Sequence, residues 1–157
     1  MNVIFKNCGD AVNFAAESKK FGVFHSTENS PNLNMHTHDC CELLLCIKGG
    51  KNFLIDNRVY EVGAGDLFVI NQFEPHKLTL QDGCKVDRYI LQLHPEFIFS
   101  VSTEDTDFSA CFYANREKAS NRISLTNNEL SAARRLFAEF EQEHGFGDDI
   151  IKISAAA

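Results

Sequence analysis

A series of short apolar segments between residues 40 and 93 is the feature that most constrains the fold. Each segment is followed by residues that favour turns: Gly49-Gly50, Asp56-Asn57, 63–65, 73–75 and 81–83. We expect six or seven strands in this stretch, and strands at such close spacing are typical of a β-sandwich or a β-barrel. The chain is therefore predicted to be mainly β.

Three polar side chains stand at the start of this stretch. His36, His38 and Glu42 are separated by even numbers of residues, so on a continuous strand they lie on one face. Leu44 and Cys46 continue the same parity. His76 follows after further turns, and a compact meander brings it back to the first three. We expect a polar cluster at one end of an inward face that becomes apolar along the strand.

Size and charge limit the class of protein. The chain has 157 residues, of which 44% are hydrophobic and 14 are Phe, so we expect a single globular domain with a substantial core. The formal net charge of −7 argues that this chain does not hold a phosphate backbone by itself. Neither a membrane span nor a signal peptide is predicted, because the sequence has no apolar run near 18 residues; we expect a cytoplasmic protein.

The six cysteines are predicted to be reduced thiols. Cys40 and Cys41 are adjacent, Cys46 lies inside a predicted strand, and no pair has the C-x-x-C spacing. A zinc site built from thiolates is therefore not expected.

Outside the central stretch the sequence predicts fewer elements. We expect a strand over 20–27, a short opening strand over 3–5 and a helical turn after Asp10. The region after His94-Pro95 has irregular apolar residues and frequent polar breakers. It is predicted to be a connection with short helices or a late strand.

A helix is predicted over residues 127–143. Thr126 stands three residues before Glu129, which is the spacing of a capping box. An apolar stripe with helical spacing follows, and we expect it to face the core: Leu130, Ala133, Phe137 and Phe140. Gly145 and Gly147 end this helix, and a second helix is predicted to start near 148–149.

The polar residues carry a resemblance to a known fold. The pattern His36, His38, Glu42 and Gly49 resembles the first cupin motif, and Gly65 followed by His76 resembles the second. The segments GDLFVINQFEPHKL and DRYILQLHPEFI resemble the N-terminal sensing domain of AraC-type bacterial transcription regulators, over roughly residues 20–150. This resemblance implies a cupin-like double-stranded β-helix (jelly-roll) barrel with one or two C-terminal α-helices.

The same resemblance implies that two parts of the chain have different functions. Residues 1–125 are expected to form the effector-binding barrel, and 126–157 a helical segment that forms a homodimer. This segment is expected to be cut short before the DNA-binding domain, so that DNA is bound only through a domain absent from this chain.

The expected partner is a small polar metabolite, and no membrane partner is expected. The predicted ligand-binding residues are His36, His38, Glu42, Cys46, Phe53, Tyr89 and His76, with Leu44 and Phe68 as further wall positions. Tyr89, Leu91 and Leu93 alternate along one strand face, which predicts a half-exposed strand.

Two alternatives remain open for the polar quartet. His36, His38, Glu42 and His76 suit one divalent ion (Zn, Fe, Mn or Ni), with all four ligands at about 2.0–2.2 Å. Equally, they could hydrogen-bond a ligand or a loop without metal. The runner-up function is a freestanding metal-dependent cupin enzyme of the dioxygenase or isomerase type. Departures from the cupin motif at Asn71, Phe73 and Leu80 weigh against it, and no catalytic residues are predicted.

Overall fold

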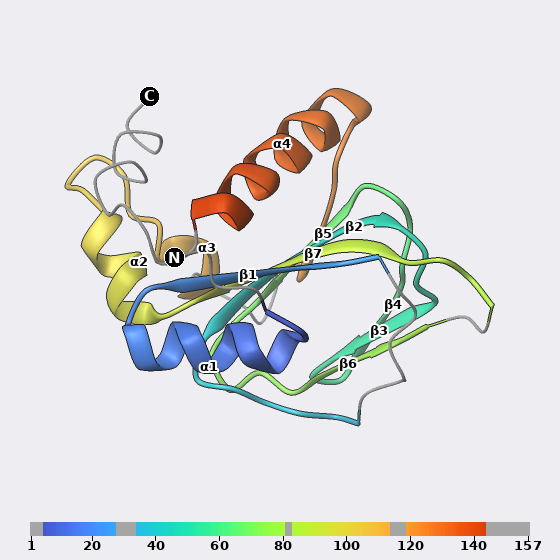
Figure 1. Ribbon diagram of the computed structural model, residues 1–157, viewed down its shortest axis with the longest axis horizontal. Helices are drawn as coiled ribbons and strands as arrows, with labels where there is room; N and C mark the ends of the chain where they lie inside the picture. Colours follow the sequence, from blue (N-terminus) through green and yellow to red (C-terminus); the bar gives the residue numbers. More distant parts are fainter. Residues whose placement is uncertain (1–4, 28–33, 81–82, 114–118, 144–157) are drawn as a thin grey trace.

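The computed structural model describes residues 5–27, 34–80, 83–113 and 119–143. The helices and strands follow one another in the order shown in Figure 1: α1 (Cys8–Ser18), β1 (Phe21–Ser26), β2 (Cys41–Lys48), β3 (Asn52–Ile55), β4 (Arg58–Glu61), β5 (Asp66–Ile70), β6 (His76–Thr79), β7 (Asp87–Leu93), α2 (Pro95–Val101), α3 (Ala110–Tyr113), β8 (Arg122–Ser124) and α4 (Asn127–Glu143). The described part of the stretch 40–93 thus holds six strands, as predicted. The connection after His94 contains two short helices and a late strand, also as predicted.

The strands form two antiparallel sheets. The larger has the order β1-β7-β2-β5-β8 and the smaller the order β4-β3-β6. An isolated bridge between His36 and His76 joins the segment before β2 to the start of β6. This architecture confirms the predicted mainly β, cupin-like jelly roll. None of the described helices is long and apolar enough to cross a membrane.

The larger sheet separates two apolar cores. The inner core draws its residues from both sheets: Leu44, Cys46, Phe53, Ile55, Phe68, Ile70 and Ile90. The outer core lies under α2, α3 and α4 on the other face of the larger sheet and includes Phe21, Val23, Cys41, Leu45, Val69, Tyr89, Leu91, Leu93, Phe97, Ile98, Phe112 and Phe137. Because side chains alternate along a strand, β2 and β7 contribute to both cores. Strand β7 is therefore buried on both faces, and the prediction that it is half-exposed was wrong.

Helix α1 is longer than the predicted helical turn. Asn7 caps it by accepting a hydrogen bond from the backbone N–H of Asp10 at 3.0 Å. Its buried positions are the small residues Ala11 and Ala15, which give only a weak apolar signal in sequence. A Cβ at Gly22 would lie 2.5 Å from the Ala11 carbonyl oxygen, so only glycine allows this close packing of α1 on β1. The predicted strand over 3–5 lies almost wholly outside the described residues.

Helix α4 has the predicted bounds, and its N-terminal cap forms as expected. The backbone N–H of Thr126 donates to Glu129 Oε2 at 2.7 Å, and the Glu129 N–H donates to Thr126 Oγ1 at 3.4 Å. The stripe ending in Phe137 and Phe140 packs on the outer core. Figure 1 shows α4 and α1 on opposite sides of the β1–β7 pair. The predicted second helix near 148–149 lies outside the described residues, and the domain division at 125/126 stays a prediction.

Candidate functional site: a polar cluster inside the barrel

Glu42 and Gln92 form the buried centre of the site. They are direct partners in the register of β2 and β7, and both side chains face inward. Gln92 Nε2 donates to Glu42 Oε2 at 2.6 Å, and the two residues are 0% and 3% exposed, respectively. Sequence reasoning missed Gln92. In the sequence, Gln92 is a polar residue between Leu91 and Leu93. Alternation along the strand would place such a residue on the solvent side, so it gave no sign of a buried site.

Two histidines complete this centre. His38 Nε2 lies 3.1 Å from Glu42 Oε2, and His76 Nε2 lies 3.7 Å from the same oxygen. His36 is brought alongside by the backbone, since its N–H donates to the His76 carbonyl at 3.1 Å and the His76 N–H donates to the His36 carbonyl at 3.0 Å. The structure therefore brings together the four polar residues that the sequence predicted to cluster. One part of the prediction was wrong: His36 and His38 do not lie on the same continuous strand as Glu42. Strand β2 begins at Cys41, and both histidines lie in the segment before it.

The pKa values in the cluster reflect two opposing effects, burial on one side and nearby charges and hydrogen bonds on the other. Burial by itself raises the pKa of Glu42, but the hydrogen bond from His38 and the nearby charge of His76 bring it down to about 2. Burial lowers the pKa of His38, yet its contact with Glu42 outweighs this and the net pKa is raised. For His76 burial prevails over the attraction of Glu42, and its pKa is lowered. The pKa values of the two histidines therefore move in opposite directions beside the Glu42 carboxylate.

The three histidines share a further arrangement that suits a metal ion. Each Nδ1 lies within hydrogen-bond distance of a backbone carbonyl: Asn34 at 3.0 Å for His36, Cys40 at 2.8 Å for His38 and Glu74 at 2.8 Å for His76. A carbonyl can only accept, so each Nδ1 carries a proton and Nε2 is the nitrogen left to bind a metal. In His38 this nitrogen donates to Glu42, so it becomes a ligand atom only when it loses its proton. One potential ligand atom from each of His36, His38 and His76 lies within 4.8 Å of the others.

Glu42 does not belong to this metal-competent group. The group found among the described residues consists of the three histidines alone, whereas Glu42 is engaged with Gln92 and His38. The prediction that all four side chains surround one ion is therefore corrected to a three-histidine set with Glu42 beside it. The physical reason is that β2 and β7 draw Glu42 into a hydrogen bond across the sheet.

The predicted wall residues fall into two groups. Cys46 and Phe53 lie in the inner core with Leu44 and Phe68, as predicted. Tyr89 does not: it belongs to the outer core, where its ring stacks on His25 with centroids 3.9 Å apart and packs on Phe137 of α4. The prediction for Tyr89 was wrong, because it lies on the odd-numbered face of β7 while Ile90 and Gln92 face inward.

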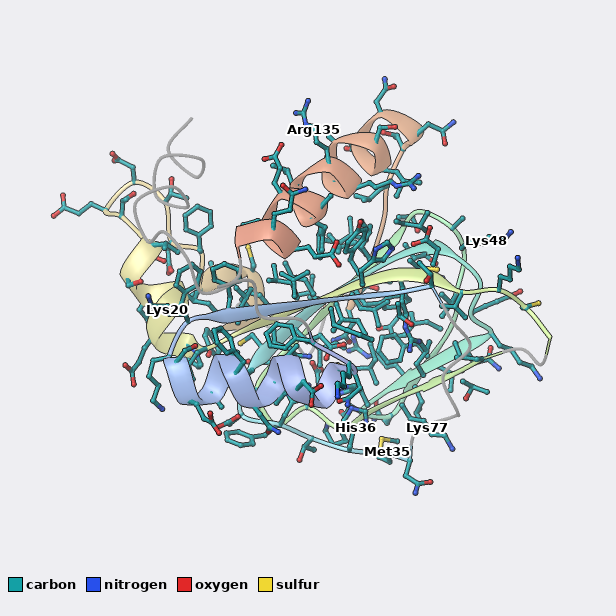
Figure 2. All side chains as sticks on the ribbon, in the orientation of Figure 1. Lys20, Met35, His36, Lys48, Lys77 and Arg135 are labelled. Carbon is teal, nitrogen blue, oxygen red and sulfur yellow. The ribbon has the colours of Figure 1, made fainter. Side chains whose placement is uncertain are left out.

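The polar cluster extends from the interior to the edge of the barrel. His76 is buried, whereas His36 is partly exposed and Met35 is exposed. Figure 2 shows His36 with Met35 and Lys77 at the lower edge of the barrel. A small molecule that contacts His36 at the surface is thus adjacent to the buried centre.

Three buried polar atoms in the described part of the chain have no hydrogen-bond partner: His76 Nε2, Gln92 Oε1 and Arg88 Nε. Arg88 lies on the inner face of β7 two positions before Ile90. Sequence reasoning also missed Arg88, which is 7% exposed. Unpartnered buried polar atoms are uncommon in native proteins, and all three of these face the barrel interior.

A jelly roll with polar groups converging on its interior defines a cupin-like ligand-binding barrel. A family model described as the AraC-like ligand binding domain matches residues 21–155, so this chain belongs to that family. The chain is thus an AraC-type sensing domain. No curated protein sequence matches it significantly.

Two solved structures of ToxT have a similar fold. An apo variant of ToxT from Vibrio cholerae is similar over 85% of this chain and 52% of its own, with 13% identity and a TM-score of 0.57. ToxT from Vibrio cholerae bound to (E)-4-(8-methylnaphthalen-1-yl)but-3-enoic acid is similar over 86% of this chain and 53% of its own, with 11% identity and a TM-score of 0.53. A cupin protein from Bacteroides fragilis covers 48% of this chain and 64% of its own, with 17% identity and a TM-score of 0.39. The chain spans about half the length of the ToxT structures.

Proposed function

We propose that this chain senses a small polar metabolite for an AraC-type transcription regulator, and that the ligand binds at the cluster of His36, His38, Glu42, His76 and Gln92. The supporting observation is that His76 Nε2 and Gln92 Oε1 are buried beside the Glu42 network without hydrogen-bond partners in the described part of the chain. Each such atom costs about 1–3 kcal/mol when left unpaired. A ligand that pairs them recovers this free energy on binding.

The chemistry of the free atoms favours a ligand that donates hydrogen bonds. His76 directs Nδ1–H to the Glu74 carbonyl, so its Nε2 is an acceptor, as are Gln92 Oε1 and the Glu42 carboxylate. Hydroxyl or amide groups of a metabolite supply matching donors. The adjoining inner core, which includes Leu44 and Phe53, gives the apolar surface that ligand sites commonly combine with a few polar groups. In one solved structure ToxT holds a small organic molecule, which is in keeping with this proposal.

The test removes one member of the cluster. We expect Glu42→Ala to weaken metabolite binding by about 1–3 kcal/mol, or roughly 5- to 150-fold in Kd, while the domain still folds. Metabolites are screened by thermal shift and then titrated by calorimetry against wild type and the variant. Glu61→Ala, which removes an exposed carboxylate of β4, is the matched control. A ligand that binds Glu42→Ala as tightly as wild type places the site elsewhere.

The second half of the proposal concerns assembly. We propose a homodimer through α4 and the apolar segment after Asp149; this segment lies outside the described residues. Leu136 on α4 is 46% exposed although the rest of the apolar stripe is packed on the barrel. Figure 2 shows the neighbouring Arg135 pointing away from the sheets. An exposed apolar side chain on a helix face is commonly buried by symmetric pairing.

The assembly is tested by light scattering over a range of concentrations. Leu136→Glu is expected to shift the dimer towards monomer. Val59→Glu places the same charge at another exposed apolar side chain, on β4, and should leave the dimer intact. A wild-type chain that is monomeric at high concentration contradicts this part of the proposal.

DNA contact is assigned to a separate domain. The net charge of −7 gives this chain little attraction for a phosphate backbone. Because a regulator of this type acts where the chromosome is, we place its action in the cytoplasm.

A specific observation also favours metal binding as a second candidate. We propose that His36, His38 and His76 hold one divalent ion, because one ring nitrogen of each lies within 4.8 Å of the others and carbonyl partners fix all three Nδ1 protons. Binding the ion would release the proton that His38 Nε2 shares with Glu42. A bound ion would act as a Lewis acid towards an oxygen of the ligand. The alternative of a metal-dependent cupin enzyme depends on the same three residues.

Calorimetric titration of the metal-free protein with Zn²⁺, Mn²⁺, Ni²⁺ and anaerobic Fe²⁺ tests this candidate. His36→Ala and His76→Ala should each abolish specific uptake, whereas His25→Gln, outside the cluster, should not. Glu42→Ala separates the three-histidine set from a four-ligand set, since only the latter predicts loss of the ion. Equal uptake by His76→Ala and wild type contradicts the metal candidate.

A further inference from the structure

Arg88 is a buried cation without a counter-ion in the described part of the chain. It lies on β7, opposite Ser26 of β1 and Cys46 of β2 in the strand register, on the face that carries Ile90 and Gln92. Its Nε is fully buried and has no hydrogen-bond partner. No described carboxylate lies within ion-pair distance of its guanidinium, although five such pairs occur elsewhere.

The acidic side chains nearest to Arg88 are engaged with other groups. Glu42 Oε2 accepts from Gln92 and lies beside His38. Asp66 accepts from the Ser124 hydroxyl at 2.9 Å and from the Gly63 N–H at 2.8 Å. Asp87, on the opposite face of β7, contacts His25 at 2.8 Å. The charge of Glu42 attracts Arg88 from a distance, but none of these carboxylates forms an ion pair with the guanidinium.

Thiolates do not supply the missing charge. Burial raises the pKa of Cys46 to about 11 and that of Cys8 to about 12, so both are neutral thiols at pH 7. An arginine cannot shed its proton to escape the cost of burial. An isolated charge inside a protein is costly unless it is paired, and within the described part of the chain no carboxylate pairs with Arg88.

We propose that Arg88 binds the carboxylate of the effector, which is thus a small organic acid rather than a neutral sugar. The guanidinium offers a planar fork of N–H donors that matches a carboxylate in two parallel hydrogen bonds. One cation balances one negative charge. A phosphate dianion would instead need a second cation.

The position of Arg88 fits a ligand that also reaches the polar cluster. Arg88 and Gln92 lie on one face with Ile90 between them, so their Cα atoms are roughly 13 Å apart on an extended strand. Because the arginine side chain is long, the gap between its guanidinium and the Gln92 amide is shorter than the Cα–Cα distance and matches the size of a metabolite. The inference rests on the proposed sensing function: the acid group binds at Arg88, and hydroxyl or amide groups bind at Gln92 and His76.

The experiment compares acids with their neutral amides. Acetate, lactate and benzoate are titrated by thermal shift and calorimetry beside acetamide, lactamide, benzamide and inorganic phosphate. We expect at least one acid to bind wild type and its amide to bind much more weakly. Arg88→Met should weaken the acid by about 30-fold or more, because it removes one partner of a buried charge pair. Arg88→Lys should retain part of the affinity.

Arg135→Met is the matched control, since it removes an arginine that is exposed on α4. Thermal unfolding without ligand verifies that the Arg88 variants are folded, and Arg88→Lys serves if Arg88→Met is not. Absence of binding by all three acids, amides that bind as well as acids, phosphate that binds more tightly, or an unchanged acid affinity in Arg88→Met each overturns the inference.

Glu42→Ala separates this inference from the proposed function. If polyols bind and depend on Glu42 but no acid depends on Arg88, the sensing site stands and the acid inference fails. If an acid depends on Arg88 but not on Glu42, the anion site stands and the polar cluster is not the place where the effector is recognised.

Discussion

The two faces of the five-stranded sheet bury different chemistry, although alternate residues of the same strands build them. On the outer face β7 presents Tyr89, Leu91 and Leu93 to the helices. On the inner face the same strand presents Arg88 and Gln92 on either side of Ile90, and β2 adds Glu42.

Polar groups stabilise a core less than apolar groups of the same size, and unpaired ones destabilise it. The outer face therefore supports the fold, whereas the inner face carries polar groups that we propose contact a ligand. The four predictions below test this contrast, beginning with the largest expected effect.

Loss of packing on the outer face should reduce stability without changing recognition. Leu45 is 0% exposed in the outer core, so Leu45→Ala should lower the free energy of unfolding by about 2–5 kcal/mol. Denaturant unfolding measures the loss, and calorimetry on the folded variant should give an unchanged affinity for the effector. Leu136→Ala, at an exposed position, should change stability by about 0.5 kcal/mol or less. A large loss of affinity in folded Leu45→Ala would break the contrast.

Removal of a polar group from the inner face should have the opposite effect on stability. Arg88→Met replaces an unpaired buried cation with an apolar side chain, so the free energy of unfolding should rise by about 1–3 kcal/mol in the absence of ligand. Denaturant unfolding beside Arg135→Met checks this sign. A clear loss of stability would show that Arg88 supports the fold rather than a site.

Alkaline pH should destabilise the inner face through its thiol. Burial, together with the nearby charge of Asp66, raises the pKa of Cys46 from 9.0 to about 11. The unfolded chain therefore releases this proton from about pH 9, while the folded chain keeps it until about pH 11. The thiol's contribution is fully present below pH 9, and above it the free energy of unfolding falls by about 1.4 kcal/mol per pH unit.

The measurement is the slope of the free energy of unfolding between pH 8.5 and 10.5, roughly the window in which the two states differ in bound protons. Cys46→Ala should reduce the slope, and Cys111→Ala, at an exposed cysteine, should not. Parallel slopes in wild type and Cys46→Ala would show that this thiol ionises alike in both states.

The smallest expected effect concerns the cap of the helix that covers the outer face. Thr126→Ala removes the hydroxyl partner of Glu129 at the start of α4 and should cost about 1 kcal/mol. Amide hydrogen exchange in the first turn of α4 should become faster, while the backbone amides of β7 stay protected. Ser131→Ala, inside the same helix, is the control and should be close to neutral. Faster exchange in β7 would mean that the two faces are not independent.

Much of this organisation could be predicted from local sequence patterns. Turn residues at regular intervals predicted the six strands of the central stretch. The capping box and the Phe137 stripe predicted α4 with its observed bounds, because both depend on residues within one or two turns of each other. The parity from Glu42 to Leu44 and Cys46 also predicted which residues share the inner face.

By itself, the sequence determined which residues lie on the same face of a strand, but not which core that face enters. Tyr89 was expected at the site, and Arg88 and Gln92 were overlooked. The alternation along β7 separates odd-numbered from even-numbered residues, but it does not tell which of the two sets faces the barrel interior. Only the packing of β7 between β1 and β2, with α2, α3 and α4 on one side and α1 and the small sheet on the other, decided it. The same tertiary pairing drew Glu42 to Gln92 and joined His36 to His76 across 40 residues, a long-range contact that local propensities do not encode.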